Sequence, residues 1–153
     1  KRLYLVDGMA LLFRSYFAML KAGLRAADGE PTWATFGFVS TIERLLEQKR
    51  PDLIGVAWDT PEPTFRHEAY PEYKGNRPDM PEEMPAQIAR VKALLEHYHI
   101  PCLELPGWEA DDLIGTLARK ADEAGYQTYC ITPDKDFFQL VTEQTYVVRP
   151  SRP

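Results

Sequence analysis

The sequence has little of what holds together a secreted or membrane protein. It contains two cysteines in 153 residues, Cys102 and Cys130, and both lie in apolar, strand-like runs. We therefore expect buried, reduced thiols rather than a disulfide. No apolar run approaches the roughly 18 residues of a membrane span, and no charged-then-apolar leader opens the chain. These absences favour a cytoplasmic globular protein with no membrane partner.

Signatures of several enzyme classes are also missing. The first apolar run, residues 3–6, is not followed by the glycine-rich turn of a dinucleotide-binding protein. Met9 stands where phosphatases with an aspartyl nucleophile need a second aspartate. Only three histidines occur, and none joins the acidic motifs described below. The absence of nearby histidine and cysteine ligands disfavours zinc at those motifs.

What is present is an alternation of apolar strands and amphipathic helices. With 44% hydrophobic and 27% charged residues, the chain has the composition of one globular domain over residues 1–153. Apolar runs predict strands at 3–6, 53–58, 100–105, 126–131 and 145–148, and helices at about 11–20, 38–50, 88–98, 110–124 and 137–141. This order predicts an α/β fold, with a mainly parallel central sheet of about five strands flanked by helices on both faces.

A proline-rich segment, about residues 60–85, interrupts this rhythm. It mixes aromatic and cationic residues, among them Phe65, Arg66, Tyr73, Lys74 and Arg77. Cations can hold phosphates while aromatic rings stack on unpaired bases, although the same composition also suits a solvated loop. The net charge of −5 argues weakly against a polyanion ligand, but bound cations would offset much of it.

Acidic residues follow each of the first four predicted strands. They are Asp7, Asp59, the group Glu109, Asp111 and Asp112, and the pair Asp134 and Asp136. Any one of them is also explained as a routine helix cap or an acidic first helical turn. Together they would lie at one edge of a parallel sheet, where two unit charges 4 Å apart repel by about 4 kcal/mol at an effective dielectric of 20. The pattern predicts a site for Mg²⁺ or Mn²⁺, with two ions about 4 Å apart as used in phosphodiester hydrolysis.

Five motifs resemble a known family. LVDGMALLFRSYF, GEPTWATFGF, VAWDTPEPTFRHEAYPEYKGNRP, PGWEADDLIGTLA and PDKDFFQLV are similar, in this order, to the 5′-nuclease domain at the N-terminus of bacterial DNA polymerase I, a flap endonuclease relative with a PIN-like fold. The resemblance implies two-metal hydrolysis of DNA near 5′ ends or flap junctions, in replication and repair. It assigns metal roles to the seven acids named above. It places DNA-contacting residues at Arg14, Phe65, Arg66 and Tyr73, and a basic pair that steers the phosphate at Lys74 and Arg77, in an arch over about residues 60–85.

The chain departs from the family in two respects. Pro133 stands before Asp134, where the family usually has glycine, so the turn is restricted and one backbone donor is lost. The family also continues into a helical DNA-binding region with further metal-binding aspartates, which this chain does not contain, and in some members a polymerase follows. The alternative is therefore a fragment that binds a 5′ junction without cleaving it.

Overall fold

The computed structural model describes residues 1–72 and 79–150. Its centre is a five-stranded sheet in the order β3-β2-β1-β4-β5, and every neighbouring pair is parallel. The strands are β1 (Arg2–Asp7), β2 (Leu53–Ala57), β3 (Cys102–Leu103), β4 (Gln127–Ile131) and β5 (Thr145–Val148). The predicted parallel α/β sheet is confirmed, and the chain order reverses between β1 and β4, its topological switch point.

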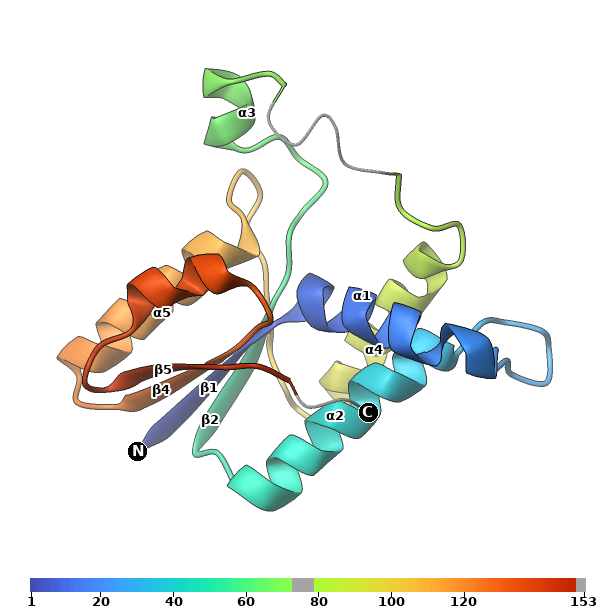
Figure 1. The fold of residues 1–153 in the computed structure, drawn as a ribbon, viewed down its shortest axis with the longest axis horizontal. Coiled ribbons are helices and arrows are strands. Elements are labelled where there is room, and N and C mark those ends of the chain that lie inside the picture. Colours follow the sequence, from blue (N-terminus) through green and yellow to red (C-terminus); the bar gives the residue numbers. More distant parts are fainter. Residues whose placement is uncertain (73–78, 151–153) are drawn as a thin grey trace.

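Helices cover both faces of this sheet, as predicted (Figure 1). On one face lie α1 (Gly8–Met19), α2 (Trp33–Lys49) and α4 (Met84–His97), which pack around Phe38 and the stacked ring of Trp58. On the other lies α5 (Ala110–Glu123), with the 3₁₀ segment η2 (Lys135–Leu140) beside it. A second 3₁₀ turn, η1 (Leu20–Ala22), extends α1.

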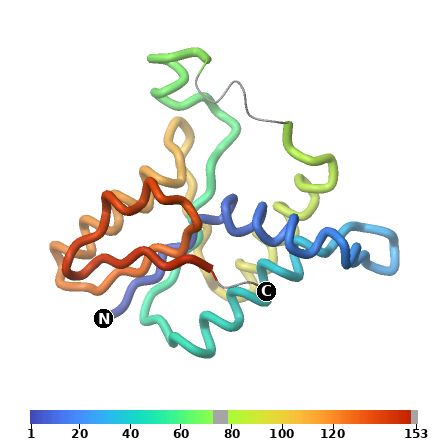
Figure 2. Tube along the Cα trace, viewed as in Figure 1, coloured from blue at the N-terminus to red at the C-terminus, as the bar shows by residue number. Residues whose placement is uncertain are grey.

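Two elements differ from the sequence prediction. The strand expected at 100–105 shrinks to Cys102–Leu103, because Pro101 and Pro106 flank it and proline cannot donate to a ladder. The proline-rich segment contains a short helix, α3 (Phe65–Ala69), which is too short to show helical periodicity. The backbone N–H of Thr64 donates to the His67 ring at 3.1 Å and closes its first turn. Figure 2 follows the chain from β2 out to α3.

One side-chain arrangement joins two helices, and another joins three strands of the sheet. Gln87 on α4 is fully buried, and its Oε1 accepts hydrogen bonds from the backbone N–H groups of Ala34 (2.7 Å) and Thr35 (3.1 Å) at the start of α2. It therefore supplies the cap that α2 lacks from its own residues. Across the sheet, the rings of Tyr4, Tyr129 and Tyr146 stack on three adjacent strands, with centroids 4.7 and 5.0 Å apart.

Both cysteines are free thiols, as expected; Cys130 is buried, whereas Cys102 is only half-buried. Burial raises the pKa of the Cys130 thiol to about 11, so this group stays protonated. Within the part of the chain that the structure describes, no helix combines the length and the apolar character needed to cross a membrane.

Candidate metal site at the carboxyl edge of the sheet

Four of the predicted acids line one hollow at the switch point, here called the inner hollow. Asp7 ends β1, Asp59 follows β2, Asp111 lies in the first turn of α5 and Asp134 follows β4. The hollow has a volume of about 520 Å³. Its acids converge because the carboxyl ends of parallel strands share one edge of the sheet. Three strand ends and one helix N-terminus therefore direct negative charge to one region.

Hydrogen bonds hold these carboxylates in place. Asp7 caps α1 by accepting from the backbone N–H of Ala10 at 3.3 Å. Asp59 accepts from the backbone N–H of Ala110 at 2.8 Å, which ties the end of β2 to the start of α5. The buried hydroxyl of Thr132 donates to Asp7 at 3.2 Å and accepts from the backbone N–H of Asp134 at 3.2 Å. Thr132 therefore joins Asp7 to Asp134, while Asp59 is joined separately to the start of α5.

Burial, together with this concentration of charge, raises the pKa of two carboxyl groups. Burial, and then the charges of Asp59 and Asp134, raise the pKa of Asp7 to about 6, although its bonds to Ala10 and Thr132 oppose the shift. Partial desolvation, and then the charges of neighbouring acids, raise the pKa of Asp111 to about 7. Within residues 1–72 and 79–150, no lysine or arginine forms an ion pair with any of the four inner acids. Their mutual repulsion is what a divalent cation would relieve.

The other predicted acids lie in a second space of about 770 Å³, here called the outer hollow. Glu109, Asp112 and Asp136 line it together with Lys135, and Asp111 lines both hollows. Glu109 and Asp112 serve as helix-capping residues, because Asp112 accepts from the backbone N–H of Glu109 at 3.0 Å. Asp134 likewise caps η2 through a 2.9 Å bond from the backbone N–H of Asp136. Three of the acids predicted to bind metal, Glu109, Asp112 and Asp134, therefore also cap helical segments.

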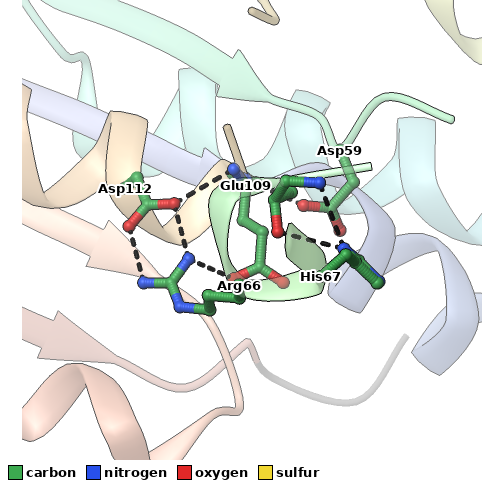
Figure 3. A network of polar contacts seen from close by, with 7 residues as sticks. Asp59, Arg66, His67, Glu109 and Asp112 are labelled. Atoms are coloured by element: carbon green, nitrogen blue, oxygen red, sulfur yellow. Dashed lines mark hydrogen bonds and ion pairs between the residues drawn. The ribbon is translucent and has the colours of Figure 1, made fainter. Parts of the chain in front are cut away.

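A cation from the proline-rich segment already pairs with the outer acids (Figure 3). Arg66 Nη1 lies 2.7 Å from Glu109 Oε2 and 2.9 Å from Asp112 Oδ2, and Nη2 lies 2.9 Å from Asp112 Oδ1. The neighbouring Phe65 ring packs on Trp108 with centroids 5.3 Å apart, and on the Arg66 guanidinium at 4.4 Å. Phe65 and Arg66, two of the residues predicted from the sequence to contact DNA, therefore contact the residues at the start of α5.

The structure does not bring the one remaining predicted DNA-contacting residue that it describes to either hollow. Arg14 lies on α1, outside the residues that line the two hollows, and its Nε is buried without a hydrogen-bond partner. Tyr73, Lys74 and Arg77 lie outside the described residues. Across the described ranges, no three His, Cys, Asp or Glu side chains are arranged closely enough to hold an ion. The seven metal assignments therefore stay a prediction that requires side-chain movement.

Two residues at the inner hollow were missed by the sequence prediction. Thr132, which joins Asp7 to Asp134, directly follows β4 and precedes the Pro133-Asp134 turn, and a hydroxyl at that place was the available signal. Lys92 on α4 is itself one of the residues that line the inner hollow, but its ammonium pairs with Glu104 at 3.0 Å and lies over the Trp58 ring. Nothing in the helical periodicity around Lys92 points to the sheet edge.

The fold and the acidic switch point define an α/β domain with a site at the carboxyl edge of its sheet that is suited to cations. Within that class, the chain belongs to the family of 5′-3′ exonuclease, N-terminal resolvase-like domains, whose model matches residues 2–152. It is 46% identical over 145 residues to DNA polymerase I of Chloroflexus aurantiacus, covering 95% of this chain and 15% of that protein. It is 40% identical to a 5′-3′ exonuclease of Aquifex aeolicus, covering 98% of this chain and 51% of that one.

A solved structure supports the same placement. T5 5′-exonuclease with bound zinc ions superposes with a TM-score of 0.71 at 27% identity, over 97% of this chain and 55% of that one. The PIN-like fold implied by the sequence resemblance is thereby confirmed. The chain spans about half the length of the exonuclease relatives and about a sixth of the polymerase relatives.

Proposed function

We propose that this chain is the catalytic domain of a divalent-metal-dependent 5′-nuclease. Its substrate would be DNA with a 5′ end or flap, cleaved at phosphodiester bonds during replication and repair. We also propose a covalently linked polymerase as a partner domain, since DNA polymerase I relatives match over this domain. We infer a cytoplasmic location for a protein that processes DNA in this way, in keeping with its two free thiols.

One observation carries this proposal: the four inner acids share a hollow in which no described lysine or arginine pairs with them. Their oxygen-only donor set fits Mg²⁺ or Mn²⁺, which prefer carboxylate ligands. The raised pKa values of Asp7 and Asp111 support the same conclusion, because they record charge that the described residues leave uncompensated. A T5 5′-exonuclease of the same fold has been solved with divalent zinc ions bound, which supports a divalent cation as the ligand of this domain.

Each group of acids would bind one ion, and neighbouring residues would position these acids. Asp7, Asp59, Asp111 and Asp134 would hold the first ion, and Glu109, Asp112 and Asp136 would hold a second ion at the outer hollow. Thr132 keeps Asp7 and Asp134 aligned, and Asp59 is fixed by the Ala110 backbone. Bound divalent cations would supply Lewis-acid stabilisation of charge developing on the phosphate.

The cationic residues would position the DNA. Arg14, and the pair Lys74 and Arg77 from the arch, would contact phosphates, as the family resemblance implies. Phe65 and Tyr73 would offer ring faces to an unpaired base. Arg66 pairs with Glu109 and Asp112 through Nη1 and Nη2, so we expect this pairing to open before its guanidinium engages a phosphate fully.

Cleavage of a labelled 5′-flap substrate in Mn²⁺ tests the proposal. Asp59→Asn keeps an oxygen that can accept from Ala110 but removes the charge, so we expect at least a hundredfold loss of cleavage with the fold retained. Asp122→Asn makes the same chemical change in the last turn of α5, away from both hollows, and serves as the control. Full-rate cleavage by D59N would refute the catalytic site.

Binding without cleavage defines the alternative. If this chain retains a 5′-flap substrate but releases no products, while the longer protein cleaves it, the chain is a recognition module that needs further ligands. This alternative is supported by the arrangement of the acids, because no three of them in the described part of the chain lie close enough together to coordinate an ion.

A further inference from the structure

The contact between α3 and α5 occupies the acids that a second ion would need. Arg66 engages Glu109 Oε2 and both carboxylate oxygens of Asp112 in a fork-to-carboxylate arrangement (Figure 3). Such two-point pairs are the strongest ion pairs that arginine forms. Three of the four carboxylate oxygens of Glu109 and Asp112 are thus committed to one guanidinium.

The acids are also shielded, which makes their neutralisation necessary. The side chain of Glu109 is 7% exposed and that of Asp112 is 19% exposed, whereas Arg66 is 32% exposed. Buried carboxylates left without a counter-charge are strongly unfavourable. When no metal is bound, Arg66 provides the compensation that a divalent ion would otherwise provide.

A guanidinium and a divalent cation cannot share these oxygens at low cost. Both are positive, and their repulsion at contact distance in a partly buried site is large. The element that carries Arg66 is a five-residue helix inside the long connection between β2 and α4, so it can move without disturbing the sheet. The Phe65–Trp108 ring contact would part with it.

From these contacts we propose that Arg66 is a built-in counter-ion that competes with a divalent cation for Glu109 and Asp112. Ion binding at the outer hollow then detaches α3 from α5, and frees Arg66 and Phe65 for the substrate. The inference rests on the proposed function for the identity of the cation. It adds to that function a control of ion binding at the outer hollow by α3. If Arg66 competes with the ion, removing its positive charge should tighten divalent-ion binding. If the ion pair has only a structural role, removing that charge should leave ion binding unchanged or weaken it.

Direct measurement of Mn²⁺ affinity without DNA tests the competition. Free Mn²⁺ is followed by electron paramagnetic resonance during titration of the protein, R66Q, R66K and the control R119Q. Arg119 is an exposed arginine on α5 that contacts Glu123 at 4.0 Å and lines neither hollow. We expect the weaker of the bound ions to bind about tenfold more tightly to R66Q, less so to R66K, and equally to R119Q. Equal or weaker binding by R66Q, or no Mn²⁺ binding by any variant, would overturn the inference.

A second readout follows α3 itself. Trp108 is 46% exposed, whereas Trp33 and Trp58 are buried, so acrylamide quenching of tryptophan fluorescence reports mainly on Trp108. Mg²⁺ should increase quenching in the unmodified protein, as the Phe65 ring leaves, and should have little effect in R66Q. Quenching that does not respond to Mg²⁺ in the unmodified protein would contradict the release of α3. Ion competition without flap cleavage would refute the proposed function and leave the counter-ion role standing.

Discussion

Asp7 should make the metal-free protein less stable as the pH rises. Its carboxyl group is 6% exposed, and its pKa is raised from 3.8 to about 6 in the folded protein. The unfolded chain therefore releases this proton at lower pH than the folded chain does. Between about pH 4 and pH 6 the unfolded state gains on the folded state, and above pH 6 the penalty is constant. A shift of about two pKa units corresponds to about 3 kcal/mol of lost stability.

Asp7→Asn removes this charge and keeps the local hydrogen bonding. The amide oxygen can still accept from Ala10, and the amide nitrogen can donate to Thr132, whose hydroxyl now serves as the acceptor. We therefore expect the difference in unfolding free energy between D7N and the unmodified protein to grow by about 3 kcal/mol from pH 4 to pH 7. In the unmodified protein, Asp111 adds a loss of stability of the same sign extending toward pH 7, which is smaller than its pKa suggests because the residue is exposed; in D7N most of this contribution remains and cancels from the difference.

Urea denaturation with EDTA, repeated at several pH values, measures this difference. Added Mg²⁺ should raise the stability of the unmodified protein most at pH 7 and should help D7N less. Asp122→Asn is again the control, because it removes a charge from α5 outside both hollows. Parallel stability curves for D7N and the unmodified protein across this pH range would refute the reasoning that buried, uncompensated charge marks the site.

Three further substitutions test the packing that positions the acids, each by urea denaturation. Gln87→Leu strands two buried N–H groups at the start of α2 and should cost about 1–3 kcal/mol for each. Gly8→Ala places a Cβ 2.8 Å from the Trp58 ring and 2.9 Å from the Ala57 carbonyl oxygen, for a loss of about 1–3 kcal/mol. Phe38→Ala empties a fully buried position beside Trp58 and should cost about 3–5 kcal/mol. Losses under 0.5 kcal/mol would mean that these contacts do not hold the layers.

The parallel sheet was predictable because its signals are local. Apolar runs of four to six residues alternate with helical periodicity, and acids follow each of the first four runs directly or within a few residues, so Asp7, Asp59 and Asp134 could be assigned to one edge before any coordinates. The same rule of parallel topology that orders the strands also brings their ends together. The extent of β3 was wrong because the flanking prolines limit pairing.

The division of the acids into two hollows was not predictable in this way. The counter-charge of the outer acids comes from Arg66, which lies 43 residues before Glu109 on a helix too short to show a period. Likewise, the hydrogen bond from Thr132 to Asp7 spans 125 residues and exists only once β1 and β4 are neighbours. The positions of the acids after the strands indicated which carboxylates gather at the sheet edge, but not which partner each carboxylate contacts.

The three stacked tyrosines give the sheet an optical signal of its own. Tyr4, Tyr129 and Tyr146 are direct register partners on β1, β4 and β5, and their rings lie nearly parallel, at 11° and 18°. Coupled aromatic chromophores held in a fixed, chiral arrangement produce near-ultraviolet circular dichroism. Fraying of β5 from β4 would therefore change the spectrum before the helices melt, and the strand that carries Asp134 at its end could be watched without an attached label.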